Sequence, residues 1–480
     1  MSGAQAKLLH YLSMHRSRVL FRNSEGQCLL YAKVAELAET RAFTRMQRRV
    51  VLCLVENDLA GLAGYLGLLA ADAIPLMLSV GTPFKRLQSL TASYSPGCVW
   101  LPESRRKEFG EAACLFTFDG YCLIDLDSPS YEIHESLALL LGTSGSTGSP
   151  QFVRLSHANV WSNAESIAQY LELDEEEVPI TTLPPSYTYG LSILHSHVVT
   201  GATIAVTKTT LFDRPFWEFV REVGATSLGG VPYHYEMLER LRFTTMDLPR
   251  LRTLTQAGGR MEPAMTRKYA LHCASRRMRY FTMYGQAEAT ARISYLPPMK
   301  AVTKAGSIGV AIPGGRLWLE DQEGNVIDES GVTGELVYQG ANVSMGYANG
   351  HQDLGKGDER HGVLRTGDMA RRDEDGDYYI VGRLKRFIKL FGHRVNLADV
   401  ETFLYEEGHV VACAGCDDVL EVYVPYEASK QAPRVKALVV QYLNVALKGV
   451  VIYGVEVLPR NDAGKVQYAE LRPQNGTCLA

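Results

Sequence analysis

Short apolar runs separated by amphipathic stretches dominate the first 130 residues of the chain. The runs lie at residues 50–55, 73–78, 98–101 and 122–124. Each run has the length and apolar content of a buried strand, and helical periodicity fills the intervals. This alternation predicts α/β layers around a mostly parallel sheet.

The same alternation resumes after residue 158 and changes character near residue 306. It predicts two helices, 159–173 and 233–242, and strands near 204–207 and 227–231. From residue 306 to 347, short β-rich segments with frequent glycines predict a small β-barrel subdomain.

A charged segment after residue 384 precedes a compact α/β pattern that runs to the last residue, 480. We therefore expect an N-terminal core of residues 1–384 and a C-terminal lid of residues 385–480. The predicted fold class is α/β, with a large N-terminal domain of layered sheets, the small β-barrel subdomain and a smaller, mobile α+β C-terminal domain. Two domains that meet at a charged joint are a common setting for a cleft with a moving lid.

Residues 61–80 are apolar over about the thickness of a bilayer, so a membrane span has to be considered. Asp72 and Pro75 interrupt this stretch, and glycine and alanine dominate its first half. A packed helix followed by a strand fits the pattern better. The first residues lack the uninterrupted apolar segment of a secretory signal, so the cytoplasm is the expected location.

Composition mainly excludes classes of function. The formal charge of −4 is small for 480 residues, so nucleic acid is not an expected partner. The nine cysteines are scattered, without the density of a disulfide scaffold. The pair Cys413 and Cys416 lacks a second cysteine or histidine pair, and its surroundings predict two strands about a turn, so neither zinc nor redox chemistry is expected.

A loop rich in glycine and hydroxyl residues follows the apolar run 137–141. After Gly142, the loop consists of Thr143, Ser144, Gly145, Ser146, Thr147 and Gly148. Its glycines let backbone N–H groups approach a ligand, and its hydroxyls add short donors, which suits phosphate oxygens better than a merely flexible turn. No Gly-Lys-Ser/Thr closes it, so it is not a Walker A loop. Residues 151–155 alternate like a strand, so the glycines are predicted to cap a hairpin.

This loop, with the following Ser156-His157-Ala158-Asn159, resembles the nucleotide loop of the adenylate-forming superfamily. That superfamily comprises acyl- and aryl-CoA synthetases, the adenylation domains of peptide synthetases, and luciferases. Further segments match its motifs in the same order up to residue 465. The resemblance implies ATP and Mg²⁺ as cofactors and a small-molecule carboxylic acid as substrate.

Several segments receive nucleotide-binding roles from the resemblance. In Tyr284-Gly285-Gln286-Ala287-Glu288, the aromatic ring would pack against adenine and Glu288 would bind Mg²⁺, which prefers oxygen ligands. Gly258-Gly259-Arg260 would line the adenine and acyl pockets. Asp368 and Arg383 would bind the ribose, whose two hydroxyls suit a carboxylate acceptor.

The resemblance also implies roles for three residues near the expected lid. Lys385 would be the hinge about which the lid rotates between two half-reactions. Arg394 would lie on the loop that swings, near the phosphate, and Lys465 would stabilise charge on the pentacoordinate phosphorus. Lys465, Glu288 and Arg394 are thus the expected catalytic residues.

Two positions depart from the family pattern. Gln151 replaces the lysine that follows the loop proline, and Ala287 replaces a threonine expected near the α-phosphate. These departures keep open a rival hypothesis, a nucleotide-binding protein without catalysis.

The start of one predicted helix carries the acyl selectivity in this superfamily. Thr188 stands where amino-acid-activating members have an aspartate, and a neutral threonine cannot neutralise a desolvated ammonium. The sequence therefore disfavours α-amino acids and favours an acid with an uncharged tail. Tyr187, where many members have a gating histidine, is predicted to line an aromatic acyl pocket with Tyr189, Tyr233 and Gly258.

The acceptor of the acyl group is expected to come from outside the chain, because no carrier domain with its serine arm is visible in it. Coenzyme A, a separate carrier protein and an amine such as an amino acid all remain open. A thiol is expected, because thioester formation is the commonest second step in the resembling families. An amide ligase is the alternative.

Overall fold

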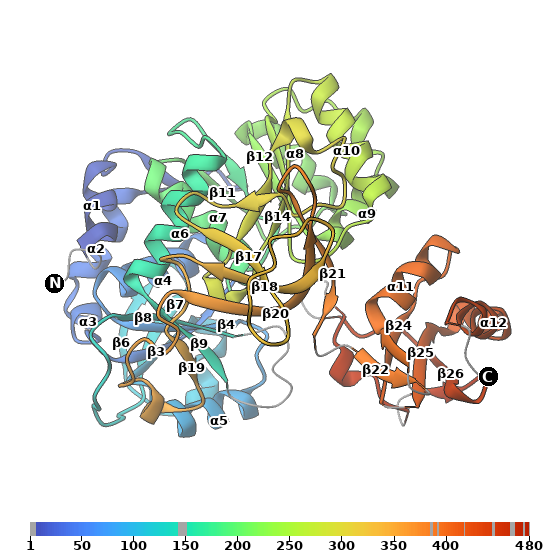
Figure 1. The fold of residues 1–480 in the computed structure, drawn as a ribbon. Coiled ribbons are helices and arrows are strands. Elements are labelled where there is room, and N and C mark those ends of the chain that lie inside the picture. The colour runs from blue at the N-terminus through green and yellow to red at the C-terminus, as the bar shows by residue number, and fades with distance from the viewer. Residues whose placement is uncertain are drawn as a thin grey trace. The chain divides into compact units, whose positions relative to one another are not determined.

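The computed structural model describes residues 6–142, 151–384, 387–390, 393–416, 418–443, 447–460, 466–473 and 476–479. Two compact units account for the chain: Met1–Arg316 with Tyr338–Leu364, and Leu317–Val337 with Arg365–Ala480. Figure 1 shows the helices and strands of both units. The predicted boundary at residue 384 stays a prediction.

An eight-stranded sheet in the first unit has the order β19-β9-β8-β4-β3-β5-β7-β6. Its strands are β3 (Val50–Val55), β4 (Ile74–Ser79), β5 (Cys98–Pro102), β6 (Cys114–Phe118), β7 (Tyr121–Asp125), β8 (Leu137–Gly142), β9 (Phe152–Ser156) and β19 (Gly346–Ala348). The central strands β8, β4, β3 and β5 run parallel, whereas the outer pairings are antiparallel. The four strands predicted within the first 130 residues are confirmed.

Strand β3 shows why these runs are apolar at every position. Its alternate residues Val51, Cys53 and Val55 pack into one apolar cluster, and Val50, Leu52 and Leu54 pack into another on the opposite face. A strand covered on both faces reads as a continuous hydrophobic run.

A nine-stranded sheet, also in the first unit, has the order β16-β15-β14-β13-β12-β10-β11-β1-β2. Its strands are β1 (Val19–Asn23), β2 (Cys28–Leu30), β10 (Pro179–Ile180), β11 (Ile204–Val206), β12 (Ser227–Gly230), β13 (Thr253–Gln256), β14 (Arg279–Tyr284), β15 (Ser294–Leu296) and β16 (Val310–Ala311). Strands β1, β11, β10, β12, β13 and β14 run parallel, whereas the pairings of β2, β15 and β16 at the edges are antiparallel.

Helices cover both faces of these sheets. One layer shares a single apolar cluster with strands of both sheets and contains α1 (Ala6–Met14), α2 (Tyr31–Glu39), α4 (Leu59–Ala70), α6 (His157–Tyr170) and α7 (Thr188–Thr200). A second layer packs on the nine-stranded sheet and contains α8 (Arg214–Val223), α9 (Pro232–Arg240) and α10 (Pro263–Ser275). Helix α5 (Phe84–Tyr94) packs on the free face of the eight-stranded sheet, and the short α3 (Arg41–Thr44) follows α2. The predicted layered α/β class is confirmed.

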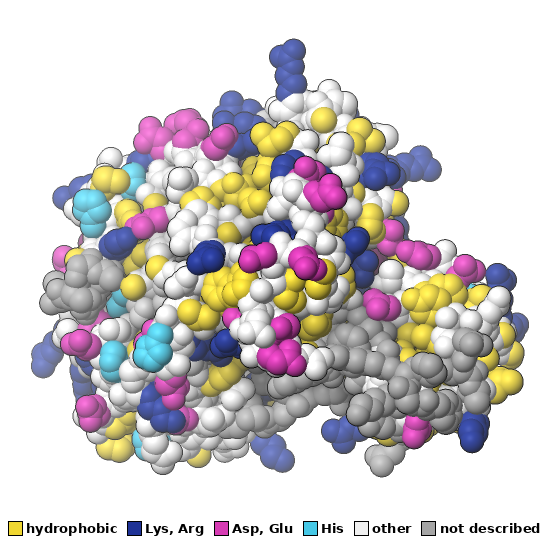
Figure 2. Space-filling view, in the orientation of Figure 1, with side chains coloured by type: hydrophobic (Ala, Val, Ile, Leu, Met, Phe, Trp, Pro, Cys, Tyr) yellow, Lys and Arg dark blue, Asp and Glu magenta, His cyan; other side chains and the backbone are white. Residues whose placement is uncertain are grey.

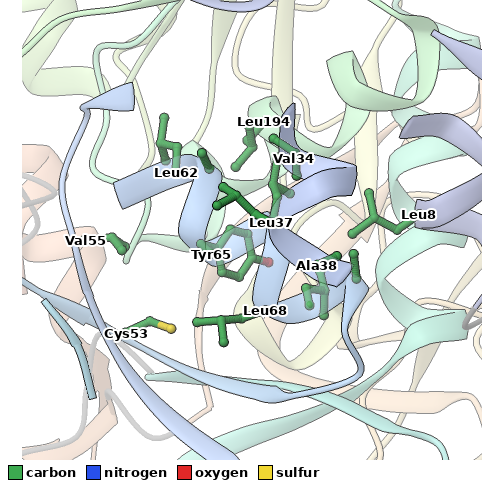
Figure 3. Packing of buried hydrophobic residues seen from close by; sticks show 14 of the residues in the cluster. Leu8, Val34, Leu37, Ala38, Cys53, Val55, Leu62, Tyr65, Leu68 and Leu194 are labelled. Carbon is green, nitrogen blue, oxygen red and sulfur yellow. The ribbon is translucent and has the colours of Figure 1, made fainter. Parts of the chain in front are cut away.

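Helix α4 accounts for the apolar stretch 61–80. All twelve of its residues are buried, and Tyr65 and Leu68 pack near Leu37 and Ala38 of α2 (Figure 3). The predicted helix followed by a strand is therefore confirmed as α4 and β4. Among the described residues, no helix combines the length and apolarity needed to cross a bilayer. The cytoplasmic location stays a prediction.

Three further sheets lie wholly or mostly in the second unit. The first has the order β17-β18-β20-β21 and consists of β17 (Arg316–Glu320), β18 (Thr333–Gln339), β20 (Val363–Arg372) and β21 (Tyr378–Arg383). The β-rich segments at 310–311 and 346–348 do not join it, because β16 pairs with β15 and β19 pairs with β9. Local sequence predicted strands there but gave no information on their partners.

The last hundred residues form a small α+β arrangement, as predicted. A hairpin of β22 (Phe387–Leu390) and β23 (His393–Asn396) precedes a four-stranded sheet of β24 (Ala412–Cys416), β25 (Val419–Pro425), β26 (Val450–Val455) and β27 (Thr477–Cys478). Helices α11 (Leu397–Glu406) and α12 (Ala432–Leu443) share one apolar core with these strands. Strands β24 and β25 are antiparallel, which confirms the predicted strands around Cys413 and Cys416.

Candidate active site

Segments that are distant in sequence meet at one edge of the nine-stranded sheet. The parallel strands β10, β12, β13 and β14 end there, and predicted site residues follow each of them. In open α/β sheets, ligands bind outside the carboxyl ends of parallel strands. This edge is therefore the candidate active site of the first unit.

Contacts around Gly258 join the segments that follow β10, β12 and β13. Gly258 has a φ of +82°, and a Cβ atom at this position would lie 2.5 Å from Tyr187 Oη and 2.9 Å from Val231 Cγ1. Glycine is needed both for the left-handed backbone and for the close approach of the tyrosine. Two residues predicted for the acyl pocket, Tyr187 and Gly258, are thus brought together. Tyr233 lies in the first turn of the neighbouring α9.

Tyr187 and Tyr189 form an aromatic corner at the start of α7. Their ring centroids are 6.4 Å apart in an edge-on arrangement. Tyr189 is buried, and its hydroxyl hydrogen-bonds to the carbonyl oxygen and to Oγ1 of Thr255 at 2.9 and 2.8 Å. Burial raises the pKa of Tyr187 to about 12, so both rings are neutral at physiological pH.

Thr188 is also buried and lines a narrow pocket between β8, α6 and α7. The pocket is lined by Leu139, Leu141, Val160, Asn163, Ala164, Ile167, Thr188, Leu191, Ser192, His195 and Thr290. Burial lowers the pKa of His195 to about 3, and its Nε2 atom lies 2.7 Å from Tyr65 Oη. The pocket is therefore lined by neutral groups.

Glu288 lies in a single 3₁₀ turn, Ala287–Ala289, directly after β14. Tyr347 of β19 donates a hydrogen bond from its hydroxyl to Glu288 Oε1 at 2.8 Å. Burial, followed by the charge of Glu288, raises the pKa of Tyr347 to about 12, so it remains a donor. The guanidinium of Arg360 lies over the Tyr347 ring, 4.9 Å from its centroid. One oxygen of the predicted metal ligand is thus oriented by a neutral donor.

The residues present fit Mg²⁺ as a shared cation rather than one enclosed by protein. Mg²⁺ usually takes one or two carboxylates and completes its shell with water and substrate phosphates. Among the described residues, no three histidine, cysteine, aspartate or glutamate side chains cluster as a metal site. A single carboxylate such as Glu288 matches this mode of binding.

Asparagine side chains fix the turn that carries Glu288. Asn342 Nδ2 donates to the carbonyl oxygens of Ala289 and Arg292, both at 2.9 Å, and Thr290 Oγ1 donates to Asn342 O at 2.7 Å. A Cβ atom at Gly285 would lie 1.7 Å from Ala291 O, so this backbone crossing requires glycine. Sequence reasoning missed Tyr347 and Asn342, because no local pattern shows a contact across more than fifty residues.

The predicted hairpin around the phosphate loop is confirmed. Strands β8 and β9 are antiparallel, with Gly142 opposite Phe152. Ser156 and Asn159 then form a capping box at the start of α6, with reciprocal hydrogen bonds of 3.0 and 2.8 Å. This explains Ser156 and Asn159 in the segment Ser156-His157-Ala158-Asn159. The loop residues Thr143–Gly148 lie outside the described residues.

Asp368 and Arg383, the predicted ribose-binding pair, meet within the second unit. They face each other across β20 and β21, and Arg383 Nε donates to Asp368 Oδ1 at 2.9 Å. Asp368 is buried, whereas the Arg383 side chain is largely exposed. Their predicted role in binding ribose stays a prediction.

The structure describes only some of the remaining predicted site residues. Lys385 and Lys465 lie outside the described residues, and Arg394 is described only by its backbone in β23. Tyr284 is the last residue of β14, and Gly259, Arg260 and Gln286 lie in the segments that follow β13 and β14. On the face shown in Figure 2, basic and acidic side chains are interspersed.

Comparison with known proteins gives consistent results. The sequence profile of the AMP-binding enzyme family matches residues 30–348. The chain is 30% identical over 346 residues to indoleacetate–CoA ligase of Aromatoleum aromaticum, covering 70% of this chain and 66% of that protein. It is 27% identical over 343 residues to 2-succinylbenzoate–CoA ligase of Bacillus pumilus, covering 70% and 68%. The matches thus span about two thirds of these relatives.

A solved structure extends the likeness to nearly the whole fold. O-succinylbenzoate coenzyme A synthetase of Bacillus subtilis, in complex with AMP, superposes with a TM-score of 0.76 at 19% identity. The superposition covers 96% of this chain and 98% of that one. At this identity the likeness supports the fold, including its large N-terminal and smaller C-terminal parts.

Proposed function

The chain belongs to the family of AMP-binding enzymes, and from that premise we propose that it activates a carboxylic acid as an acyl-AMP and then transfers the acyl group to a thiol. The main support is the convergence at one sheet edge of the aromatic acyl corner and of Glu288, oriented by Tyr347. Both lie in the unit whose phosphate loop follows β8. Ligand recognition and charge neutralisation are the two requirements of adenylation.

The first step needs ATP, since a carboxylate has a poor leaving group. An oxygen of the substrate carboxylate attacks the α-phosphorus of ATP, the new P–O bond forms, and the bond to pyrophosphate breaks. Mg²⁺, when held by Glu288, neutralises phosphate charge. The loop Thr143–Gly148 binds phosphate oxygens, and Lys465 and Arg394 compensate the charge that develops on phosphorus. The aromatic corner of Tyr187 and Tyr189 excludes water from the reacting carboxylate.

In the second step a thiol attacks the acyl carbonyl. The thioester bond forms, AMP leaves with the electrons of the C–O bond, and the thiol proton passes to solvent. Coenzyme A is the proposed thiol, because the relatives named above are CoA ligases. An amine acceptor is the alternative: it would attack the same carbonyl, release AMP and give an amide.

The non-catalytic rival rests on Gln151 and Ala287. Ala287 packs against the apolar cluster between the two sheets, where a threonine hydroxyl would need a partner. This packing offers a structural reason for the departure that is independent of loss of activity. Within the described residues, Glu288 accepts a hydrogen bond from Tyr347, and Ser156 and Asn159 form the capping box.

ATP–pyrophosphate exchange with a panel of carboxylic acids tests the proposal. We expect acid-dependent exchange that requires Mg²⁺ and that falls at least a hundredfold in Glu288→Gln, with Glu323→Gln, an exposed glutamate in a turn, as the matched control. Offering coenzyme A, a phosphopantetheinylated carrier protein or amino acids in turn, with mass spectrometry of the products, then identifies the acceptor. Failure of every acid to support exchange would favour the non-catalytic rival, and a product only with amino acids would overturn the thiol.

A further inference from the structure

Arg292 is a buried cation whose side-chain partners are all neutral. Its side chain is 2% exposed. Its Nη2 donates to Ser192 Oγ at 3.0 Å, its Nη1 contacts Tyr170 Oη at 3.5 Å and the sulfur of Met283, and the Tyr189 ring lies 4.2 Å from its Cζ. Its Nε is buried and has no hydrogen-bond partner. In the described part of the chain, the charge of Arg292 thus lacks a carboxylate partner.

A second buried arginine shows what a structural guanidinium looks like in this protein. Arg154 is completely buried, yet it donates to the carbonyl oxygens of Tyr347, Met345 and Lys356 and pairs with the carboxylate of Glu359. All the requirements of its charge are met by the chain. Arg292 has five N–H donors in the same fork but only weak or neutral acceptors. Burial of a charge without a partner is costly, so the protein retains Arg292 despite an unfavourable contribution to folding.

Arg292 also borders the candidate acyl site. Its guanidinium stacks on Tyr189, one of the two aromatic residues at the start of α7. Its partner Ser192 lines the narrow pocket together with Thr188. The positive charge opposes the upward shift that burial gives to the pKa of Tyr187 and of Tyr189. The field of Arg292 therefore acts on the groups that would surround the tail of the acid.

We propose that Arg292 binds a second carboxylate at the far end of the acid substrate, so that the enzyme selects dicarboxylic acids. This inference rests on the proposed function and names its substrate class. A guanidinium fork matches a carboxylate with two parallel hydrogen bonds, and in a buried site such a pair is strong. The same charge would repel an α-ammonium group, in agreement with the absence of an aspartate at Thr188. The proposed acid substrate thus has an anionic tail, in place of the uncharged tail expected from the sequence.

Matched pairs of acids test this selection. Hexanoate with adipate and octanoate with suberate differ in charge at the far end but little in length. We expect kcat/KM for exchange to favour the dicarboxylic member in wild type. The ratio of dicarboxylic to monocarboxylic kcat/KM should fall at least tenfold in Arg292→Gln and less in Arg292→Lys. Arg279→Gln is the matched control, because it removes an arginine of β14 that pairs with Glu172, and it should leave the ratio unchanged.

Wild-type preference for the monocarboxylic member of every pair would overturn the proposal, as would an unchanged ratio in Arg292→Gln. Thermal melting without ATP gives a second measurement, which does not depend on catalysis. Dicarboxylic acids should raise the melting temperature of wild type more than their monocarboxylic partners, and this difference should vanish in Arg292→Gln. If that variant does not fold, the wild-type difference alone decides, and its absence overturns the proposal. Absence of exchange with all acids would instead count against the proposed function, whereas the melting shift still reports on Arg292.

Discussion

Replacing Tyr347 by phenylalanine removes one oxygen and so tests how Glu288 is held. The Tyr347 hydroxyl donates to Glu288 Oε1 at 2.8 Å, and no other change to the ring is made. A hydrogen bond to a charged acceptor contributes about 1.5–3 kcal/mol. Because Tyr347 is only partly buried, the lower end applies, and about 1.5 kcal/mol corresponds to about tenfold in an equilibrium constant.

We therefore expect Tyr347→Phe to raise the Mg²⁺ concentration needed for half-maximal pyrophosphate exchange by about tenfold. The ring keeps its packing against Arg360, so the melting temperature should change by less than about 3 °C. Since the pKa of Tyr347 is raised to about 12, the donor is present across neutral pH, and the defect should be the same from about pH 6 to about pH 9.

Tyr379→Phe is a close control for this experiment. Tyr379 donates to the carboxylate of Asp373 at 3.2 Å and has the guanidinium of Arg371 over its ring at 5.4 Å. Tyr379 thus makes the same kind of tyrosine–carboxylate hydrogen bond away from Glu288. Removing its hydroxyl should leave the Mg²⁺ dependence of pyrophosphate exchange unchanged. An unaltered Mg²⁺ dependence in Tyr347→Phe, with normal folding, would refute the positioning role.

Three further outcomes follow from the sequence motifs and the buried histidines. Lys465→Ala should lower exchange by at least a hundredfold without altering the melting temperature; undiminished exchange would show that the lysine assignment is wrong. Lys385→Pro fixes φ at one value, so acyl-AMP formation measured by mass spectrometry should persist while transfer to the thiol collapses. Burial lowers the pKa of His195 to about 3 and that of His197 to about 4. Below about pH 6.5 the folded protein therefore binds fewer protons than the unfolded chain, which lowers the free energy of unfolding. Denaturant titrations at about pH 5 should give a value lower than at neutral pH by about 2 kcal/mol per histidine.

Periodicity predicted most of the fold because both sheets are buried on two faces. The continuous apolar run of β3 and the wholly buried α4 follow directly from that burial. The sequence could not show that the segments 310–311 and 346–348 pair with β15 and β9, because strand partners depend on distant residues.

The candidate site, like the fold, combines residues that the sequence could predict with contacts that it could not. Motifs located Glu288 and Gly258, since their chemistry and backbone needs are local. The supporting contacts of Tyr347 and Asn342 depend on tertiary structure. The missing partner of Arg292 could not be predicted either, because an arginine in a sequence carries no sign of whether a carboxylate lies near it.

The turn after β14 carries both the proposed Mg²⁺ ligand and the arginine proposed to bind the far carboxylate. Glu288 and Arg292 lie on the same short segment, and Asn342 and Asn163 bind its backbone oxygen atoms, including that of Arg292. The backbone spacing between metal ligand and cation is therefore set by the fold and not by the substrate. In an apolar pocket, each added methylene strengthens binding until the pocket is full. A cation at a fixed distance from the reaction centre instead strengthens binding only of a diacid whose length matches that distance. Selection by Arg292 thus implies a single preferred diacid length, on either side of which kcat/KM falls while the monocarboxylic series shows no matching optimum.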